Sequence, residues 1–497
     1  MKRNLENWGS ESSTDHCCAD QCSAVQCSAV QSSEVVLSGR NLSDRSAARM
    51  VRSFMFMVCL LIVFSVLPAT RAWAQPDVVL DNFNVIPDSE NSFSTLVADP
   101  WGNLYGTAAQ GGAFGFGTVF VLCAPGMTQP VPCQVGHGPW AEFVLYSFMG
   151  PGANDGANPR STLIFGGNYA GRDFTLYGTT YNGGNPGTCA GVGCGTVFEL
   201  CAPALVGGCG NAGWVEHVLH QFAGVRDGAH PFGGVIADKA NYLYGTTVYG
   251  GGFGKCLVGA VNEYCGTVFK MKHNAAWVFA EAPIHRFKGA AVDGAEPTSA
   301  LCCNTNGGIA VLYGTTFIGG KNNAGTVFQV ANAPGYAEAV LYNFCSAVGC
   351  TDGANPYAPV IFDAAGNMYG TTFNGGIAGG CGGQGCGTIF NLGVLPAPIW
   401  NFLGTPDGAH PTAGLTLNAG VLYGTTLEGG VPAGLGTIYQ FPLPFGPDLV
   451  RWSFVGAPGD GANPFGGVIF DPPVPGGFLY GTTLDAGGLG FGVAYLE

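Results

Sequence analysis

The chain has 497 residues and a formal net charge of −14, with 83 glycines and only 10% charged residues. This charge excludes nucleic acid as an expected partner, because binding to a phosphate backbone depends on clustered Lys and Arg. The high glycine and aromatic content, without sustained apolar spacing at three and four residues, favours many short strands and almost no helix.

The first part of the chain differs from the rest. Residues 1–49 contain a Ser/Cys/Ala-rich duplication and no repeat, so we expect an extension that is disordered or not translated. Residues 50–74 resemble a signal peptide: Arg52, an apolar run over 54–67, and an A-W-A cleavage site before Gln75. A membrane-spanning helix needs about 20 apolar residues, so the shorter run favours secretion of residues 75–497 without a membrane span.

Cysteine usage agrees with export. Of the 19 cysteines, the fourteen after residue 74 fall into seven close pairs, and such pairs in an exported chain predict disulfides that staple loops. No pair has the C-x2-C spacing of a zinc knuckle, so we expect no metal and no cofactor. Adjacent Cys302 and Cys303 could bridge only through a strained ring, so their state stays open. The six expected disulfides are Cys123/Cys133, Cys189/Cys194, Cys201/Cys209, Cys256/Cys265, Cys345/Cys350 and Cys381/Cys386.

Residues 75–497 consist of seven copies of one unit. Each unit has a short apolar run, a Y-G-T-T strand, a Gly-Gly loop, a G-T-V-F strand and an L-Y-x-F strand, and a D-G-A-x-P turn leads to the next unit. The Y-G-T-T tyrosines are Tyr105, Tyr177, Tyr244, Tyr313, Tyr369, Tyr423 and Tyr480. The six regular turns begin at Asp155, Asp227, Asp293, Asp352, Asp407 and Asp460.

Seven units of four strands predict an all-β fold, a seven-bladed β-propeller of four-stranded antiparallel blades. The two ends support a ring. A lone L-Y-x-F-type strand stands at 79–83, and the last unit stops at 492–496, which aligns with the third strand. We therefore expect the N-terminal strand to complete the last blade, which would remove an exposed sheet edge. The D-G-A-x-P turns and the Gly-Gly loops should then emerge on one face, which we call the top face.

The Y-G-T-T, Gly-Gly, G-T-V-F and D-G-A-x-P segments resemble the GloVer tandem-repeat (choice-of-anchor) family of exported bacterial proteins over about residues 79–497. The resemblance implies a secreted or surface-attached protein without an established activity. Because no hydrophobic tail or sorting domain follows Glu497, we expect release from the cell.

Two features of the D-G-A-x-P turns could be mistaken for metal sites. A ring of Asp carboxylates could bind Ca²⁺, but calcium needs more oxygens, and Asp at the start of a turn ordinarily caps backbone N–H groups. His230 and His410 occupy the x position of two turns. They are far apart around the ring, so we interpret them as surface histidines rather than ligands of a shared metal.

The second position after each Y-G-T-T is the best candidate for a ligand rim, because five of seven side chains there are polar or acidic and should lie on the top face. Glu428 and Asp485 belong to adjacent blades and form the weak candidate for the paired carboxylates of a glycosidase. Loop solvation explains these two carboxylates more simply than catalysis does. The expected binding residues are Gln110, Asn182, Tyr249, Asn374, Glu428 and Asp485, and Ile318 fills the position in the fourth blade.

Fold and loop placement together favour a secreted, monomeric binding protein that engages a carbohydrate or a surface protein through top-face loops. Two alternatives stay open: an extracellular polysaccharide hydrolase or lyase, and a structural matrix protein. The G-x-S-x-G, H-E-x-x-H and phosphate-loop motifs are absent from the sequence.

Overall fold

A computed structural model describes residues 78–497, and its propeller forms one compact unit, Ala74–Glu497. The expectations for 1–49 and for the signal peptide over 50–74 lie outside the described residues. No described helix is long and apolar enough to cross a membrane. The segments without a description are 84–86, 127–132, 134–139, 167–173, 204–212, 253–255, 259–260, 273–280, 290, 292, 304–308, 378–379, 394–396, 445, 448, 458, 471–477 and 489.

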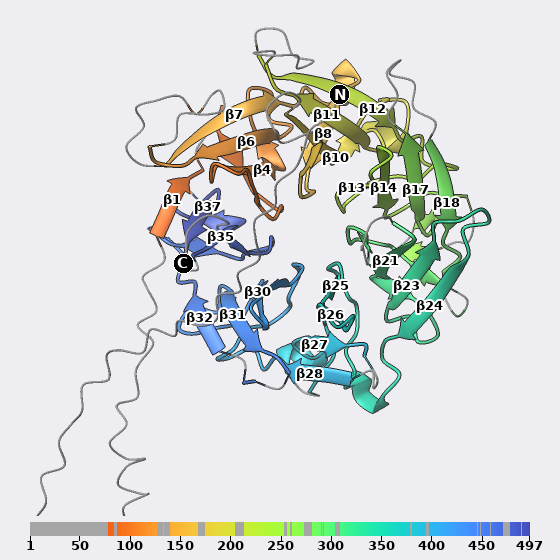
Figure 1. The fold of residues 1–497 in the computed structure, drawn as a ribbon, viewed down its shortest axis with the longest axis vertical. Coiled ribbons are helices and arrows are strands. Elements are labelled where there is room, and N and C mark those ends of the chain that lie inside the picture. Colours follow the sequence, from red (N-terminus) through yellow and green to blue (C-terminus); the bar gives the residue numbers. More distant parts are fainter. Residues whose placement is uncertain are drawn as a thin grey trace, which may run out of the picture. The chain divides into compact units, whose positions relative to one another are not determined.

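Seven antiparallel sheets stand side by side around a central axis, which confirms the predicted seven-bladed β-propeller (Figure 1). The strands are given from the axis outward. Blade 1 contains β3 (Val97–Ala98), β4 (Leu104–Ala108), β6 (Thr118–Cys123) and β7 (Ala141–Ser147). Blade 2 contains β9 (Ile164–Gly166), β10 (Thr175–Gly183), β11 (Thr196–Cys201) and β12 (Val215–Gln221). Blade 3 contains β13 (Ile236–Ala237), β14 (Tyr242–Thr247), β17 (Thr267–Lys272) and β18 (Glu281–Arg286). Blade 4 contains β20 (Cys302–Cys303), β21 (Val311–Thr316), β23 (Thr326–Ala331) and β24 (Glu338–Asn343).

The last three blades have the same order. Blade 5 contains β25 (Ile361–Phe362), β26 (Met368–Thr372), β27 (Thr388–Asn391) and β28 (Ala397–Asn401). Blade 6 contains β29 (Thr416–Asn418), β30 (Val421–Thr426), β31 (Thr437–Pro442) and β32 (Leu449–Ser453). Blade 7 contains β34 (Ile469–Phe470), β35 (Leu479–Thr482), β37 (Val493–Leu496) and, from the other end of the chain, β1 (Val78–Asn82).

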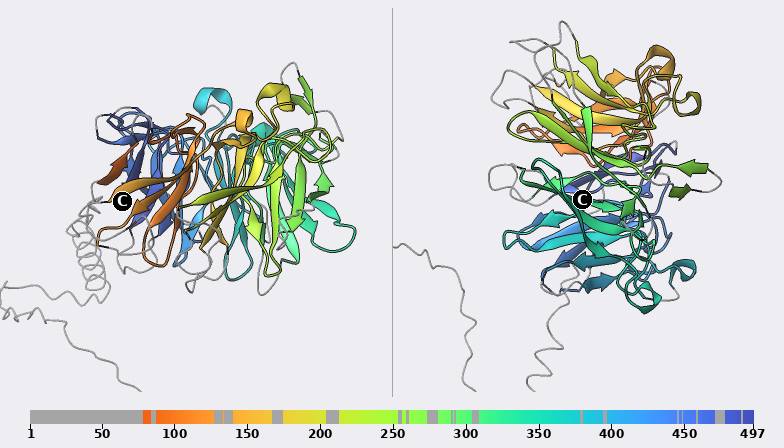
Figure 2. Two further views of the ribbon diagram at one scale, coloured as in Figure 1. Left: turned by 90° about the horizontal axis from the view of Figure 1, so that it is seen from above. Right: turned by 90° about the vertical axis from the view of Figure 1, so that its right-hand side faces the viewer.

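Short elements join the two kinds of top-face connection. In blade 4 the D-G-A-x-P turn pairs with the residue that follows Y-G-T-T, Ala295 with Ile318, so both connections lie on one face. Figure 2 shows the short 3-10 turns projecting from one side of the ring. The small strands are β2 (Ser89–Glu90), β5 (Gln110–Gly111), β8 (Gly156–Pro159), β15 (Cys256–Val258), β16 (Val261–Glu263), β19 (Gly294–Ala295), β22 (Ile318–Gly319), β33 (Gly461–Ala462) and β36 (Asp485–Ala486). The 3-10 turns are η1 (Pro151–Ala153), η2 (Cys189–Gly191), η3 (Val348–Cys350) and η4 (Cys381–Gly383).

The repeat residues are fixed by contacts within and between blades. The glycine of Y-G-T-T lies under the aromatic ring of G-T-V-F on the neighbouring strand, and a Cβ added at Gly314 would stand 2.6 Å from Cζ of Phe328. The same ring packs against the last Phe of the preceding blade, with Phe287 and Phe328 centroids 5.1 Å apart. Equivalent pairs occur at all seven blade boundaries, at 5.0 to 5.4 Å. The hydrophobic core therefore lies between blades, and all six residues of a strand such as β6 are buried.

A ring of threonines ties the blades together near the axis. The hydroxyl of the first Thr in Y-G-T-T donates a hydrogen bond to a backbone carbonyl at the start of the next blade, as Thr315 does to Ala358 at 2.9 Å. Six of the seven boundaries have this bond. Thr371 in blade 5 is buried, and its hydroxyl has no hydrogen-bond partner among the described residues. The first threonine of the motif is thus a structural residue.

The predicted closure of the ring is confirmed. β1 pairs antiparallel with β37, with Val78 opposite Leu496 and Asn82 opposite Val493, and Figure 1 shows the two strands side by side. Phe83 is fully buried, and its ring centroid lies 5.4 Å from that of Phe120 in blade 1. The N-terminal strand therefore completes blade 7 and also seals it against blade 1.

Five of the six expected disulfides are confirmed: Cys123–Cys133, Cys189–Cys194, Cys256–Cys265, Cys345–Cys350 and Cys381–Cys386. Cys201 is also disulfide-bonded, while its expected partner Cys209 lies outside the described residues. Cys302 is half-buried on the innermost strand of blade 4, and the side chain of Cys303 is not described. Whether Cys302 and Cys303 form a bridge stays an open prediction.

Candidate functional site

The aspartates of the D-G-A-x-P turns act within the turns. Asp352 is buried and accepts hydrogen bonds from the Tyr342 hydroxyl and the Ser346 N–H, both at 2.8 Å. The residue at the Tyr342 position is Tyr, His or Trp in six blades, and in five of them it donates to the turn aspartate. This supports the turn-capping interpretation, because the carboxylate oxygens are used by donors of the protein.

The residue at the x position of each turn links neighbouring blades. His230 and His410 adopt left-handed φ angles of 56° and 57°. Each Nδ1 donates a hydrogen bond of 2.9 Å to the carbonyl of an aromatic residue in the preceding blade, Tyr181 or Phe373, and each imidazole packs against that residue's ring. The expectation of surface histidines is corrected here, since both are half-buried inter-blade donors.

The residue directly after each turn proline points to the axis. In blades 1, 3, 5 and 7 it is aromatic, and in blade 2 it is Arg160, so five side chains converge on the top end of the channel. We call Phe93, Arg160, Phe232, Tyr357 and Phe465 the axial cluster. Phe232 is its centre, with its ring centroid 5.4 Å from Tyr357, 5.8 Å from Phe465 and 6.4 Å from Phe93.

The axial cluster borders a cavity of about 320 Å³ inside the channel. Beyond the cluster the walls are formed by small residues just before the innermost strands, among them Ser161, Gly233, Ala358 and Gly466. All five cluster residues are half-buried. The channel therefore combines a narrow, small-residue wall with an aromatic mouth that carries a single cation.

Arg160 is held against aromatic faces. Its guanidinium carbon lies 4.4 Å from the ring centroid of Tyr181, 4.9 Å from that of Phe93 and 5.6 Å from that of Phe232. Such cation–π contacts orient a guanidinium without neutralising it. No carboxylate of the described residues forms an ion pair with Arg160, and its buried Nε has no acceptor there.

Tyr357 shows which groups surround the cluster. Burial raises the pKa of Tyr357 well above its usual value, and the Arg160 guanidinium partly opposes this increase. Tyr181, Tyr249 and Glu296 also act on Tyr357, each raising its pKa. The polar groups therefore gather on the side of the axis formed by blades 2 to 5, while Phe93 and Phe465 form an apolar side.

The expected rim residues occupy the top face but do not converge. Gln110, Glu428 and Asp485 are exposed. Asn182 donates to the Asn158 side chain at 3.0 Å, and Asn374 donates to the Asn355 side chain at 3.1 Å, so both amides are used by the turns. Tyr249 adjoins the axial aromatic residues, with its ring 6.0 Å from His230. Burial raises the pKa of Asp485 without a contribution from Glu428, so this carboxylate pair stays an untested prediction.

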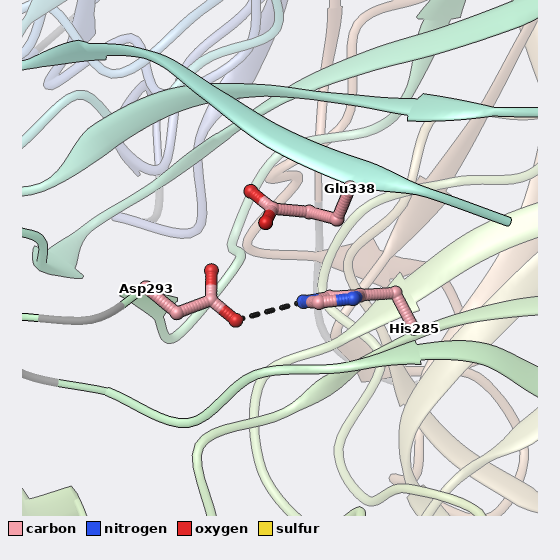
Figure 3. A group of neighbouring side chains, drawn as sticks. All are labelled: His285, Asp293 and Glu338. Carbon is pink, nitrogen blue, oxygen red and sulfur yellow. Dashed lines mark hydrogen bonds and ion pairs between the residues drawn. The ribbon is translucent and has the colours of Figure 1, made fainter.

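One group of side chains has the donors of a metal site. His285, Asp293 and Glu338 bring one ligand atom each within 4.8 Å of the others. Figure 3 shows His285 hydrogen-bonded to Asp293 while Glu338 approaches from the next blade. Burial, and then the charge of Asp293, raises the pKa of Glu338 to about 7. The His285–Asp293 bond is the same contact that caps the other turns, so the fold accounts for it without a metal.

The sequence-based reasoning missed the axial cluster. The informative position was the one after the proline of D-G-A-x-P, which holds Phe, Arg, Tyr or Thr in successive blades. This position lies just before the innermost strand of each blade. Bulky side chains at the same position of several blades therefore meet near the axis of the propeller. An aromatic residue in four units and one arginine were therefore the available signal.

The fold and the axial cluster define a repeat-built β-propeller with a candidate ligand site at its channel mouth. Sequence comparison places the chain in a family: it belongs to the Gloeobacter/Verrucomicrobia repeat proteins, whose profile matches residues 62–310 and 254–495. This confirms the GloVer resemblance. A comparison with curated protein sequences gives no match.

Comparison with solved structures gives matches of low identity and low TM-score. TolB from Acinetobacter baumannii is 11% identical with a TM-score of 0.32. The match covers 65% of this chain, and this chain spans 63% of the length of TolB. A PL25 polysaccharide lyase, an ulvan lyase bound to -[GlcA(1-4)Rha3S]-, is 10% identical with a TM-score of 0.40, covering 82% of this chain and 94% of its own. The GH43_1 enzyme from Xanthomonas citri is 11% identical with a TM-score of 0.28, and the match covers 53% of this chain and 84% of the enzyme's chain.

Proposed function

We propose that the protein is a secreted carbohydrate-binding propeller whose ligand engages the axial cluster from the top face. The observation that carries the proposal is the convergence of four half-buried aromatic residues on a cavity of about 320 Å³. The faces of aromatic rings carry negative potential, and sugar rings offer C–H groups to such faces. Ligand pockets are typically apolar, with a few placed polar groups.

The surroundings support recognition of a polar ligand. Tyr181, Tyr249 and Glu296 lie beside the aromatic members and supply hydroxyl and carboxyl groups. The confirmed disulfides support an exported protein, since disulfides persist in oxidising compartments. A monomeric state remains part of the same proposal.

The test is binding of the purified protein to a glycan array, followed by calorimetry on the best ligand. Phe232→Ala removes the central ring of the cluster and should weaken binding at least about tenfold, the size of effect expected for a binding hot spot. Trp101→Ala is the matched control, because Trp101 is an exposed aromatic residue in the first-to-second strand turn on the opposite face.

Wild-type binding that is lost in Phe232→Ala and kept in Trp101→Ala would support the proposal, provided that both variants keep the wild-type melting profile. Absence of binding to any glycan would overturn it. Capture of a surface protein through the same residues would also overturn the carbohydrate assignment, in favour of a protein ligand.

A further inference from the structure

We propose that the ligand of the axial cluster is an acidic saccharide, whose carboxylate or sulfate group is bound by Arg160. The inference deepens the proposed function and rests on it. Six of the seven positions that follow the turn proline or its equivalent hold Phe, Tyr or Thr. Arg160 is the single charged side chain in this set, and it breaks the sevenfold pattern at the place where the side chains meet.

The guanidinium is prepared for an anion. The rings of Tyr181, Phe93 and Phe232 lie 4.4 to 5.6 Å from its central carbon and limit its motion. A guanidinium presents a planar fork of donors that matches two oxygens of a carboxylate or sulfate. No described carboxylate pairs with Arg160, so a ligand anion would not have to displace a partner from the protein.

The net charge of the chain does not by itself attract anions to Arg160. The chain carries a formal net charge of −14, so its long-range field repels anions. An acidic ligand must therefore gain its affinity from close contact with Arg160 and with the aromatic rings. A cavity of about 320 Å³ is at the lower end of the ligand-pocket range. One charged sugar unit would then occupy the axial cavity, and the adjacent sugar units of the same saccharide would lie on the top face of the protein.

The experiment compares matched ligands by calorimetry on the full protein. The probes are a galacturonic acid hexamer, its fully methyl-esterified form, a sulfated oligosaccharide and neutral xylohexaose. We expect the wild type to bind the uronate or the sulfated probe at least about tenfold more tightly than the ester and the neutral probe, which corresponds to about 1.4 kcal/mol. Preference for one acidic probe identifies the anionic group.

The variants test the residue. Arg160→Gln should remove the preference for the acidic probe, and Arg160→Lys should retain part of it, because the charge stays while the planar fork is lost. Arg226→Gln is the control, since Arg226 is an exposed arginine of the next top-face turn. Equal affinity of the wild type for the uronate and its ester, with no sulfate preference, would overturn the acidic assignment while glycan binding stands. Absence of binding to every saccharide would overturn both proposals.

Discussion

The first threonine of Y-G-T-T matters because of the bond it makes to the next blade. Both Thr315 and Thr371 are fully buried in equivalent positions, but among the described residues only Thr315 has an acceptor, the carbonyl of Ala358. A buried hydroxyl costs free energy when it has no partner, while the same hydroxyl stabilises the fold when it is paired. Two blades of the same protein thus provide a comparison between a paired and an unpaired threonine.

Thr315→Val should destabilise the propeller by about 1–2 kcal/mol, because the isosteric change leaves the buried carbonyl of Ala358 without its donor. Thr371→Val should be neutral or slightly stabilising, because it removes a hydroxyl that has no hydrogen-bond partner in the described part of the chain. Denaturant unfolding of both variants measures the difference. Equal losses of unfolding free energy in the two variants would contradict the assignment.

The glycine of Y-G-T-T should tolerate no side chain, because the neighbouring aromatic ring occupies the space of a Cβ. In Gly314→Ala the new methyl group would stand 2.6 Å from the Phe328 ring, and such overpacking costs about 1–3 kcal/mol. Gly152→Ala is the control, since no heavy atom lies within 4 Å of a Cβ placed there. Thermal melting would show a lower transition for Gly314→Ala alone, and matching melting curves for the two variants would be inconsistent with this packing role.

At the scale of elements, β1 is the strand on which the ring depends. Without it the edge of β37 would be exposed, and unpaired strand edges promote aggregation. Phe83 follows β1 directly and fills the boundary between blades 7 and 1. The smallest change that tests this element is therefore at Phe83.

Phe83→Ala should cost about 3–5 kcal/mol, the usual loss for a fully buried Phe, and should increase light scattering on heating. The control is Phe114→Ala, because Phe114 is 57% exposed in a top-face loop. An unchanged denaturant midpoint in Phe83→Ala would contradict the claim that Phe83 stabilises the closure of the ring.

At the scale of the whole molecule, carboxyl groups recur at blade boundaries. Burial, and then the charge of Asp155, raises the pKa of Glu216 to about 8, and the Glu338 carboxyl shows the same effect at another boundary. Both folded values exceed the ordinary 4.5 of glutamate. The stabilising contribution is therefore complete below pH 4.5 and is lost as pH rises through about 7 to 8.

The free energy of unfolding should accordingly fall between about pH 5 and pH 9. Glu216→Gln keeps the shape and removes the titration, so it should flatten the profile, whereas Glu428→Gln on the exposed rim should not. Unfolding curves across this range measure both. A wild-type profile that is flat or rises with pH would refute the assignment of these carboxyls.

The enzymatic alternative makes a different prediction for the rim. If the protein cleaved a polysaccharide through Glu428 and Asp485, then Glu428→Gln and Asp485→Asn would each reduce turnover by about a hundredfold or more. Reducing-end release from acidic and neutral polysaccharides measures this. Because Glu428 and Asp485 are exposed and neither lines the axial cavity, we expect any turnover to be unaffected.

The sequence by itself determined the architecture. Seven Y-G-T-T units specify seven blades, because strands of one unit pair with neighbours only a short distance away in the chain. The confirmed disulfides and the turn aspartates followed for the same reason: their partners are local in the chain. The closure followed from a different signal: an unpaired strand at 79–83 and a last unit that lacks its fourth strand.

The tertiary structure alone decided where the candidate site lies. Phe93 and Phe465 are 372 positions apart in the chain, and their rings meet at 5.0 Å only because the ring brings blades 1 and 7 together. The rim residues were predicted from their polarity at one position of the repeat. How far a side chain lies from the axis depends instead on the twist and tilt of every blade. Convergence on an axis is a property of the closed ring, and no single repeat contains it.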